Sequence, residues 1–131
     1  PHPAELARLC GVTAGEVMSD RLGFAYRLSE KYGVTVLAKS ADPVAVDGGK
    51  VYLCTEGTTA LAKGGSGDML AGIVSSYVAQ GCDALDAAAL GSFTLGSTAL
   101  LAGYKRSERG IIARDVIDAL PRFLYDLENA D

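Results

Sequence analysis

A glycine-rich loop that runs directly into a predicted helix carries the clearest chemical signal in the sequence. Residues 62–68 read A-K-G-G-S-G-D. Glycine tolerates positive φ and lets another group approach the backbone closely. The first N–H groups of the following helix have no internal partners and carry partial positive charge, so the junction predicts an anion site suited to a phosphate. The lysine and hydroxyl residue that end a Walker A motif are absent.

Asp68 lies where a carboxylate would repel a bound phosphate, which makes it a candidate for chemistry rather than for binding. The positive end of the helix favours its ionised form. That form could accept a proton from a hydroxyl group that attacks a bound phosphoryl group. Aspartate also commonly caps helices, and the loop taken alone favours this simpler role.

Two other residues are candidates for the same site. Lys39 directly follows the apolar run 34–38, which predicts a buried strand of a parallel sheet. Ligands of open α/β sheets bind beyond the carboxyl ends of such strands. His2 is the only histidine and lies between two prolines, ahead of a helix. The alternatives are a solvated surface lysine and an exposed terminal histidine without a role.

The elements that must position these residues follow from periodicity and capping signals. Apolar residues recur at helical spacing from the capping box at Thr13 to Tyr32, which predicts one helix that ends at Gly33. The D-G-G-K sequence between two β-branched runs predicts a hairpin of strands 44–46 and 51–53. Further helices are expected at 4–10, from the glycine-rich loop to about 81, from 83 or 86 to about 103, and at 114–127, where Pro121 predicts a kink or break.

Composition excludes several classes of protein. The 131 residues are 49% apolar without an internal repeat, so one packed α/β unit is expected. The net charge of −4 argues against a nucleic-acid partner. The uncharged stretch 87–104 is short and rich in small residues, which favours a buried helix, packed closely through its glycines 91, 96 and 103, over a membrane span. Three widely spaced cysteines predict reduced thiols, no zinc site and a cytoplasmic location.

Three segments match the motifs of one known family in order and spacing. Residues 1–9 are similar to a T-P-H-P-G-E-x-A-R-L segment, and residues 36–41 to a V-L-K-G-x-x-T segment. Residues 57–72, G-T-T-A-L-A-K-G-G-S-G-D-M-L-A-G, resemble the signature G-x-x-x-L-A-x-G-G-S-G-D-V-L-x-G. These motifs are typical of the ADP/ATP-dependent NAD(P)H-hydrate dehydratases of the ribokinase-like superfamily. The chain departs from them at Ser40, at Pro43, which lacks an N–H group, and at Lys63, which could add a charge near the phosphates.

The resemblance implies an α/β fold, the ribokinase-like three-layer α/β/α sandwich. Residues 1–131 would form the C-terminal portion of a single domain without an internal boundary, completed by an N-terminal half. It also implies an enzyme, a lyase that repairs hydrated NAD(P)H. ADP or ATP, with Mg²⁺, would phosphorylate the ring hydroxyl, and loss of phosphate would restore the cofactor. A homo-oligomer without nucleic-acid or membrane partners is expected.

The same resemblance implies roles for individual residues. Asp68 would be the catalytic base at the substrate hydroxyl, and His2 would contact the hydrated dinucleotide. The transferring phosphoryl group would be held by the amides of Gly65, Ser66 and Gly67. The nucleotide would lie against Lys39, Ser40, Ala41, Asp42, Pro43 and Gly67, and no metal ligand is assigned.

Two alternatives stay open. A vitamin-precursor kinase of the same superfamily, such as a hydroxyethylthiazole or hydroxymethylpyrimidine kinase, would share the loop and the carboxylate. The chain could also be an inactive fragment or nucleotide-binding module that needs its N-terminal half. The proline-flanked His2 and the A-L-A-K-G-G-S-G-D context favour the dehydratase over the kinase.

Overall fold

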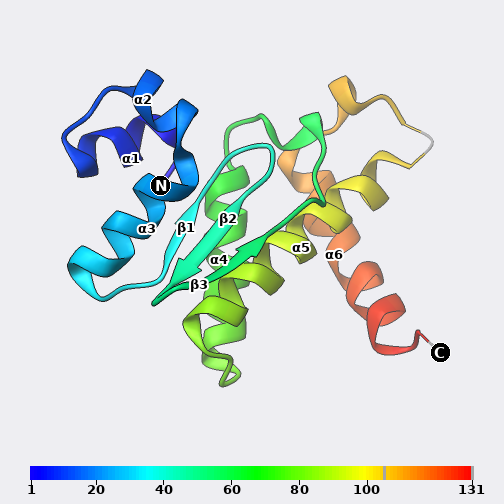
Figure 1. The fold of residues 1–131 in the computed structure, drawn as a ribbon. Helices are drawn as coiled ribbons and strands as arrows, with labels where there is room; N and C mark the ends of the chain where they lie inside the picture. The colour runs from blue at the N-terminus through cyan, green and yellow to red at the C-terminus, as the bar shows by residue number, and fades with distance from the viewer. Residues whose placement is uncertain (105, 131) are drawn as a thin grey trace.

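The computed structural model describes residues 1–104 and 106–130, which fold into three layers (Figure 1). The middle layer is a sheet of strands β1 (Val36–Ala38), β2 (Val44–Asp47) and β3 (Lys50–Leu53). Helix α3 packs on one face and α5 on the other, and the remaining helices pack against these two. The helices are α1 (Pro3–Cys10), α2 (Ala14–Ser19), α3 (Arg21–Tyr32), α4 (Ser66–Ala79), α5 (Ala84–Gly103) and α6 (Ala113–Glu128), with short 3₁₀ turns η1 (Thr59–Leu61) and η2 (Glu108–Gly110).

The strands of the described sheet pair in antiparallel fashion. Leu37 of β1 lies opposite Ala45 of β2, and Val46 of β2 lies opposite Val51 of β3. The expectation of a parallel strand at 34–38 is therefore wrong for this sheet. Only five residues connect β1 to β2, whereas a parallel neighbour needs a crossover of about a dozen or more. The predicted hairpin between β2 and β3 is confirmed.

Alternate residues of β1 face two separate cores, as the pleat of a strand requires. Val36 and Ala38 pack in the core of the N-terminal helices, with Leu6 and Leu28. Leu37 lies on the other face, in the core formed with α5. Helices thus cover both faces of β1, which explains its continuous apolar run, and the strand's carboxyl end leads directly into the candidate site.

The predicted helix at 13–32 is in fact two helices. Asp20 has φ −147° and ψ 56°, outside the helical region, and its Oδ1 accepts the N–H of Gly23 at 3.0 Å as the N-cap of α3. The apolar spacing continues across this break and therefore conceals it. The expected break at Pro121 is also wrong, because α6 runs through it. The packing of Phe123 edge-on against Phe93 of α5, at 6.0 Å between ring centroids, holds the helix beyond the proline.

Helix α5 is the central helix of the C-terminal layer. It is long and apolar enough to cross a membrane by length and composition, yet 56% of that stretch is buried inside the structure. A Cβ atom on Gly91 would lie 2.4 Å from Cγ2 of Val74 in α4, and one on Gly103 would lie 3.1 Å from Cδ1 of Ile111. The prediction that its glycines allow close packing is confirmed. The three cysteines, Cys10, Cys54 and Cys82, are free.

Candidate functional site

A cavity of about 680 Å³ lies beyond the carboxyl end of β1. Its walls come from the N-terminal segment, from the loop that follows β1, from residues 55–59 and from the first turn of α4. The sequence-predicted residues that line it are His2, Lys39, Ser40, Ala41, Pro43, Ser66 and Gly67. Three segments distant in the sequence therefore meet at one site. Gly65, Asp68 and Asp42 border these segments but are not among the lining residues.

The glycine-rich loop presents the positive end of α4 without a capping side chain. Gly65 has φ +91° and ψ −18°, a left-handed conformation that favours glycine, and no described side chain caps this helix. The loop is tied back on itself, because Ser66 Oγ donates to the carbonyl of Lys63 at 2.7 Å. Asp68 lies inside the first turn of α4, at the third residue after the cap residue Gly65, and its side chain is exposed. The simpler role of Asp68 as the helix cap is therefore excluded.

Lys39 brings a cation to the same helix end. Its N–H donates to the carbonyl of Pro1 at 2.8 Å, which joins the N-terminal segment to the end of β1. Its Nζ lies 3.4 Å from the position that a Cβ atom on Gly67 would occupy. An ammonium group and the first turn of α4 thus converge on one point, and both favour an anion there.

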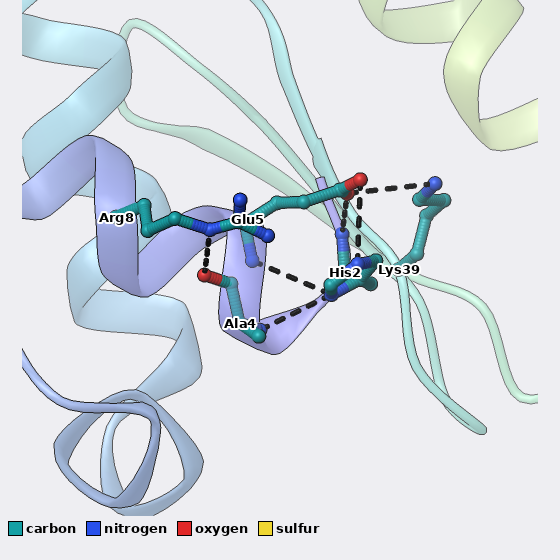
Figure 2. A network of polar contacts seen from close by, with 5 residues as sticks. All are labelled: His2, Ala4, Glu5, Arg8 and Lys39. Atoms are coloured by element: carbon teal, nitrogen blue, oxygen red, sulfur yellow. Dashed lines mark hydrogen bonds and ion pairs between the residues drawn. The ribbon is translucent and has the colours of Figure 1, made fainter.

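His2 and Glu5 form a reciprocal cap at the start of α1 (Figure 2). The Nδ1 of His2 accepts the N–H groups of Ala4 and Glu5 at 3.2 and 3.3 Å, so the ring proton is assigned to Nε2, which lies 3.3 Å from Glu5 Oε1. Glu5 Oε2 accepts the N–H of His2 at 2.7 Å. This hydrogen bond is the main cause that lowers the pKa of Glu5. His2 is therefore fixed in orientation and is not a terminal residue without a role.

Asp42 shapes the loop after β1 instead of lining the cavity. Arg21, at the start of α3, donates from Nη2 to the Asp42 carbonyl at 2.7 Å and lies 2.9 Å from its Oδ2. The Oγ of Ser40 accepts the N–H of Asp42 at 3.1 Å. The hydrogen bond from Arg21 is the largest cause that lowers the pKa of Asp42. Arg21, with a side chain only 17% exposed, anchors this wall of the cavity.

Lys63 does not add its charge to the cavity, contrary to the expectation from the sequence. Its Nζ donates to the carbonyl of Ile111, in the segment that leads into α6. A Cβ atom on Gly65 would lie 3.5 Å from Cβ of Ala113, so the loop also packs on the start of α6. Because the loop packs on the start of α6, the Lys63 side chain reaches the Ile111 carbonyl and donates its hydrogen bond to it.

Several cavity residues were missed by the sequence analysis. Residues 55–59 form a wall, as do Ser92 and Leu95 of α5. A smaller cavity of about 400 Å³ adjoins it and shares Pro43, Thr55, Glu56 and Ser92. Residues 55–59 are largely irregular and have no hydrophobic period, and Ser92 and Leu95 occupy ordinary buried positions of α5, so periodicity did not mark any of them as site residues. The G-T-T start of the matched signature was the one available signal.

We expect Arg21→Ala to lower the free energy of unfolding by about 1–2 kcal/mol, because a charged hydrogen-bond donor to loop 39–43 is lost. The affinity for the nucleotide that the sequence resemblance implies should fall as well, since the loop forms a wall of the cavity. Denaturant unfolding and a binding titration measure the two effects. Arg122→Ala is the control, because its exposed pair with Asp126 on α6 should matter little. Equal effects of the two variants would contradict the anchoring role.

The pair of Arg21 and Asp42 also predicts a pH dependence. Because the pKa of Asp42 is lowered in the folded protein, the stability it contributes is fully present above the ordinary value of 3.8 and is lost as the pH falls through the lowered pKa. The stability difference between the parent protein and Arg21→Ala should therefore shrink at low pH. Unfolding midpoints of both proteins at neutral and strongly acidic pH measure this difference. A constant difference would contradict the pairing.

Comparison with known proteins identifies relatives of the whole chain. The family model described as NAD(P)H-hydrate dehydratase matches residues 1–122. The bifunctional NAD(P)H-hydrate repair enzyme Nnr of Moorella thermoacetica is 39% identical over 129 residues, which cover 98% of this chain and 24% of that protein. The ADP-dependent (S)-NAD(P)H-hydrate dehydratase of Neisseria meningitidis serogroup B is 39% identical over 100 residues, 76% of this chain and 34% of that protein.

Solved structures with the same fold confirm the predicted fold class. The ADP/ATP-dependent NAD(P)H-hydrate dehydratase from Bacillus subtilis, co-crystallized with ATP/Mg²⁺, superposes with a TM-score of 0.86 at 28% identity, over 95% of this chain and 46% of that chain. A ribokinase-like superfamily protein from Enterococcus faecalis has a TM-score of 0.80 at 24% identity, over 96% and 43%. The chain thus spans 24% to 46% of the length of these relatives.

Proposed function

Because the chain belongs to the NAD(P)H-hydrate dehydratase family, we propose that its protein restores hydrated NADH or NADPH by a nucleotide-dependent dehydration. The observation that carries this proposal is the convergence of Lys39 and the uncapped start of α4 at one cavity edge, with the exposed Asp68 in the same first turn of the helix. A cation and free amides suit the phosphates of ADP or ATP, and the carboxylate suits a hydroxyl-bearing substrate.

The reaction follows from the weakness of hydroxide as a leaving group. Asp68 takes the proton of the ring hydroxyl while the hydroxyl oxygen attacks the terminal phosphorus of the nucleotide. The new O–P bond forms while the bond to the departing nucleotide breaks, so that ADP leaves AMP. In the second step the C–O bond breaks and phosphate departs with the electron pair. A proton leaves the neighbouring ring carbon, and the double bond of NAD(P)H is restored.

In this proposal, the first turn of α4 and the loop before it contact the nucleotide phosphates. The amides of residues 65–67 face the transferring group in this proposal, and Lys39 neutralises part of the phosphate charge. The N–H of Ser66 has only a long contact of 3.5 Å to the Lys63 carbonyl, so it can turn to a better acceptor. The loop 39–43 holds the rest of the nucleotide, and His2, which lies beside Lys39 with Glu5 between them, contacts the hydrated dinucleotide.

Mg²⁺ fits this site as a partner of the nucleotide. Within residues 1–104 and 106–130, no group of three or more His, Cys, Asp or Glu side chains gathers to form a metal cage. Magnesium at phosphoryl-transfer sites takes most of its ligands from the phosphates and water, so the nucleotide itself would bring the ion to the loop. When bound, the ion would offset charge that develops on the phosphoryl oxygens.

A substrate panel tests the proposal. The purified protein is incubated with ADP or ATP and, separately, with hydrated NADH, hydrated NADPH, a hydroxyethylthiazole and a hydroxymethylpyrimidine. We expect nucleotide consumption only with the two hydrated cofactors. Consumption only with a thiazole or pyrimidine alcohol would instead make the protein a vitamin-precursor kinase. The mass of the active species in the same preparation tests the expected homo-oligomer.

A further inference from the structure

The ammonium group of Lys39 is already paired with an anion of the protein itself. Its Nζ lies 3.8 Å from Oε2 of Glu5, and both side chains are partly exposed (Figure 2). Lys39 also lines the cavity. The same ammonium lies beside Gly67, in the first turn of α4. Glu5 therefore places a negative charge next to the point where a cation and a helix N-terminus favour a phosphate.

Glu5 is held in this position by the cap of α1. Its Oε2 accepts the N–H of His2 at 2.7 Å, and its Oε1 lies 3.3 Å from the His2 ring. These contacts, together with the charge of Lys39, keep its pKa low, so the carboxylate stays ionised near neutral pH. It can neither move away freely nor lose its charge when another anion arrives.

We propose that Glu5 is a built-in counter-anion of the nucleotide site, which pairs with Lys39 when no phosphate is bound and competes with the nucleotide phosphates for it. The inference rests on the proposed function, since it assumes that nucleotide phosphates bind beside Lys39. A phosphate that takes Lys39 leaves Glu5 without that partner and close to a second anion. The affinity for ADP is therefore lower than the site could reach, and the same repulsion favours release of AMP and phosphate after turnover.

Glu5→Gln tests this proposal because it removes the charge and keeps the cap. Glutamine serves the same position of a capping box as glutamate. We expect the variant to bind ADP about 3-fold to 10-fold more tightly in calorimetric titrations at low salt, because the repulsion between two nearby charges is removed. The gain should shrink at high salt, which screens that repulsion.

Two further variants separate this effect from a structural one. Glu16→Gln makes the same change in the capping box of α2, where Glu16 caps Thr13, and should leave ADP affinity unchanged. In a Lys39→Met background, Glu5→Gln should gain much less, since competition for the lysine has been removed. If Glu5→Gln binds ADP no more tightly than the parent protein, the counter-anion proposal is overturned while the proposed function stands. If the parent protein binds neither ADP nor ATP, both are overturned.

Discussion

Asp68→Asn should abolish turnover while ADP still binds. An asparagine has nearly the same shape but cannot accept the proton of the substrate hydroxyl, and loss of a general base typically lowers a rate by roughly 10²–10⁴-fold. Asp68 lies in the first turn of α4, outside the cavity lining, so the proposed nucleotide contacts of the loop and Lys39 should stay in place. The rate of the dehydration and the dissociation constant of ADP are the two quantities to measure.

The control for this substitution is Asp118→Asn, which changes an exposed aspartate of α6 that pairs with Arg114 one turn away. It should leave both the rate and the affinity unaltered. One outcome for Asp68→Asn would contradict its role as the catalytic base. If ADP affinity falls and activity returns at saturating ADP, Asp68 belongs to the nucleotide site and is not the catalytic base.

Gly96→Ala should destabilise the protein and disturb the cavity together. A Cβ atom at this position would lie 2.4 Å from the carbonyl oxygen of Glu56 and 2.8 Å from its carbonyl carbon. These are backbone atoms of the cavity wall 55–59 and cannot rotate away as a side chain can. We expect the free energy of unfolding to fall by about 1–3 kcal/mol, the usual effect of overpacking, with weaker ADP binding because the wall must shift.

Gly72→Ala is the matched control for this prediction. Gly72 is also a helical glycine, in α4, but a Cβ atom there would meet nothing within 4 Å. Alanine favours the helix over glycine, so this variant should be more stable by up to about 1 kcal/mol. Denaturant unfolding of both variants decides the question. Equal stability of Gly96→Ala and the parent protein would show that the wall is not held against α5 as described.

Local features of this fold were predictable from the sequence because their causes are local. The turn at Gly48 and Gly49 needs positive φ, which the structure gives as +48° and +86°, and the D-G-G-K sequence supplies it. Asp83, one of the two expected starting points, caps α5. The glycine-rich loop that leads into α4 was likewise predictable, because its glycines directly precede a helical segment.

Features that depend on contacts between distant residues were not predictable. Two local features were also missed. The five-residue link between β1 and β2 favours an antiparallel pair, and the Asp20 cap divides α2 from α3 although the apolar spacing continues across it. Arg21 and Asp42 are 21 residues apart, and no pattern links them. Glu5 belonged to a matched motif, but its contact with Lys39 arises only when β1 brings the two segments together. The candidate site was thus predictable as a set of motifs, and its supporting residues were not.

The central claim is that the site couples consumption of a nucleotide to the restoration of NAD(P)H. The most direct test follows the near-ultraviolet absorbance of NADH while the protein acts on hydrated NADH with ADP, and measures AMP in the same samples. The proposed function predicts that the absorbance returns only with nucleotide present, and that one AMP appears for each NADH restored. AMP formation without recovery of NADH absorbance, or recovery without nucleotide, would contradict it.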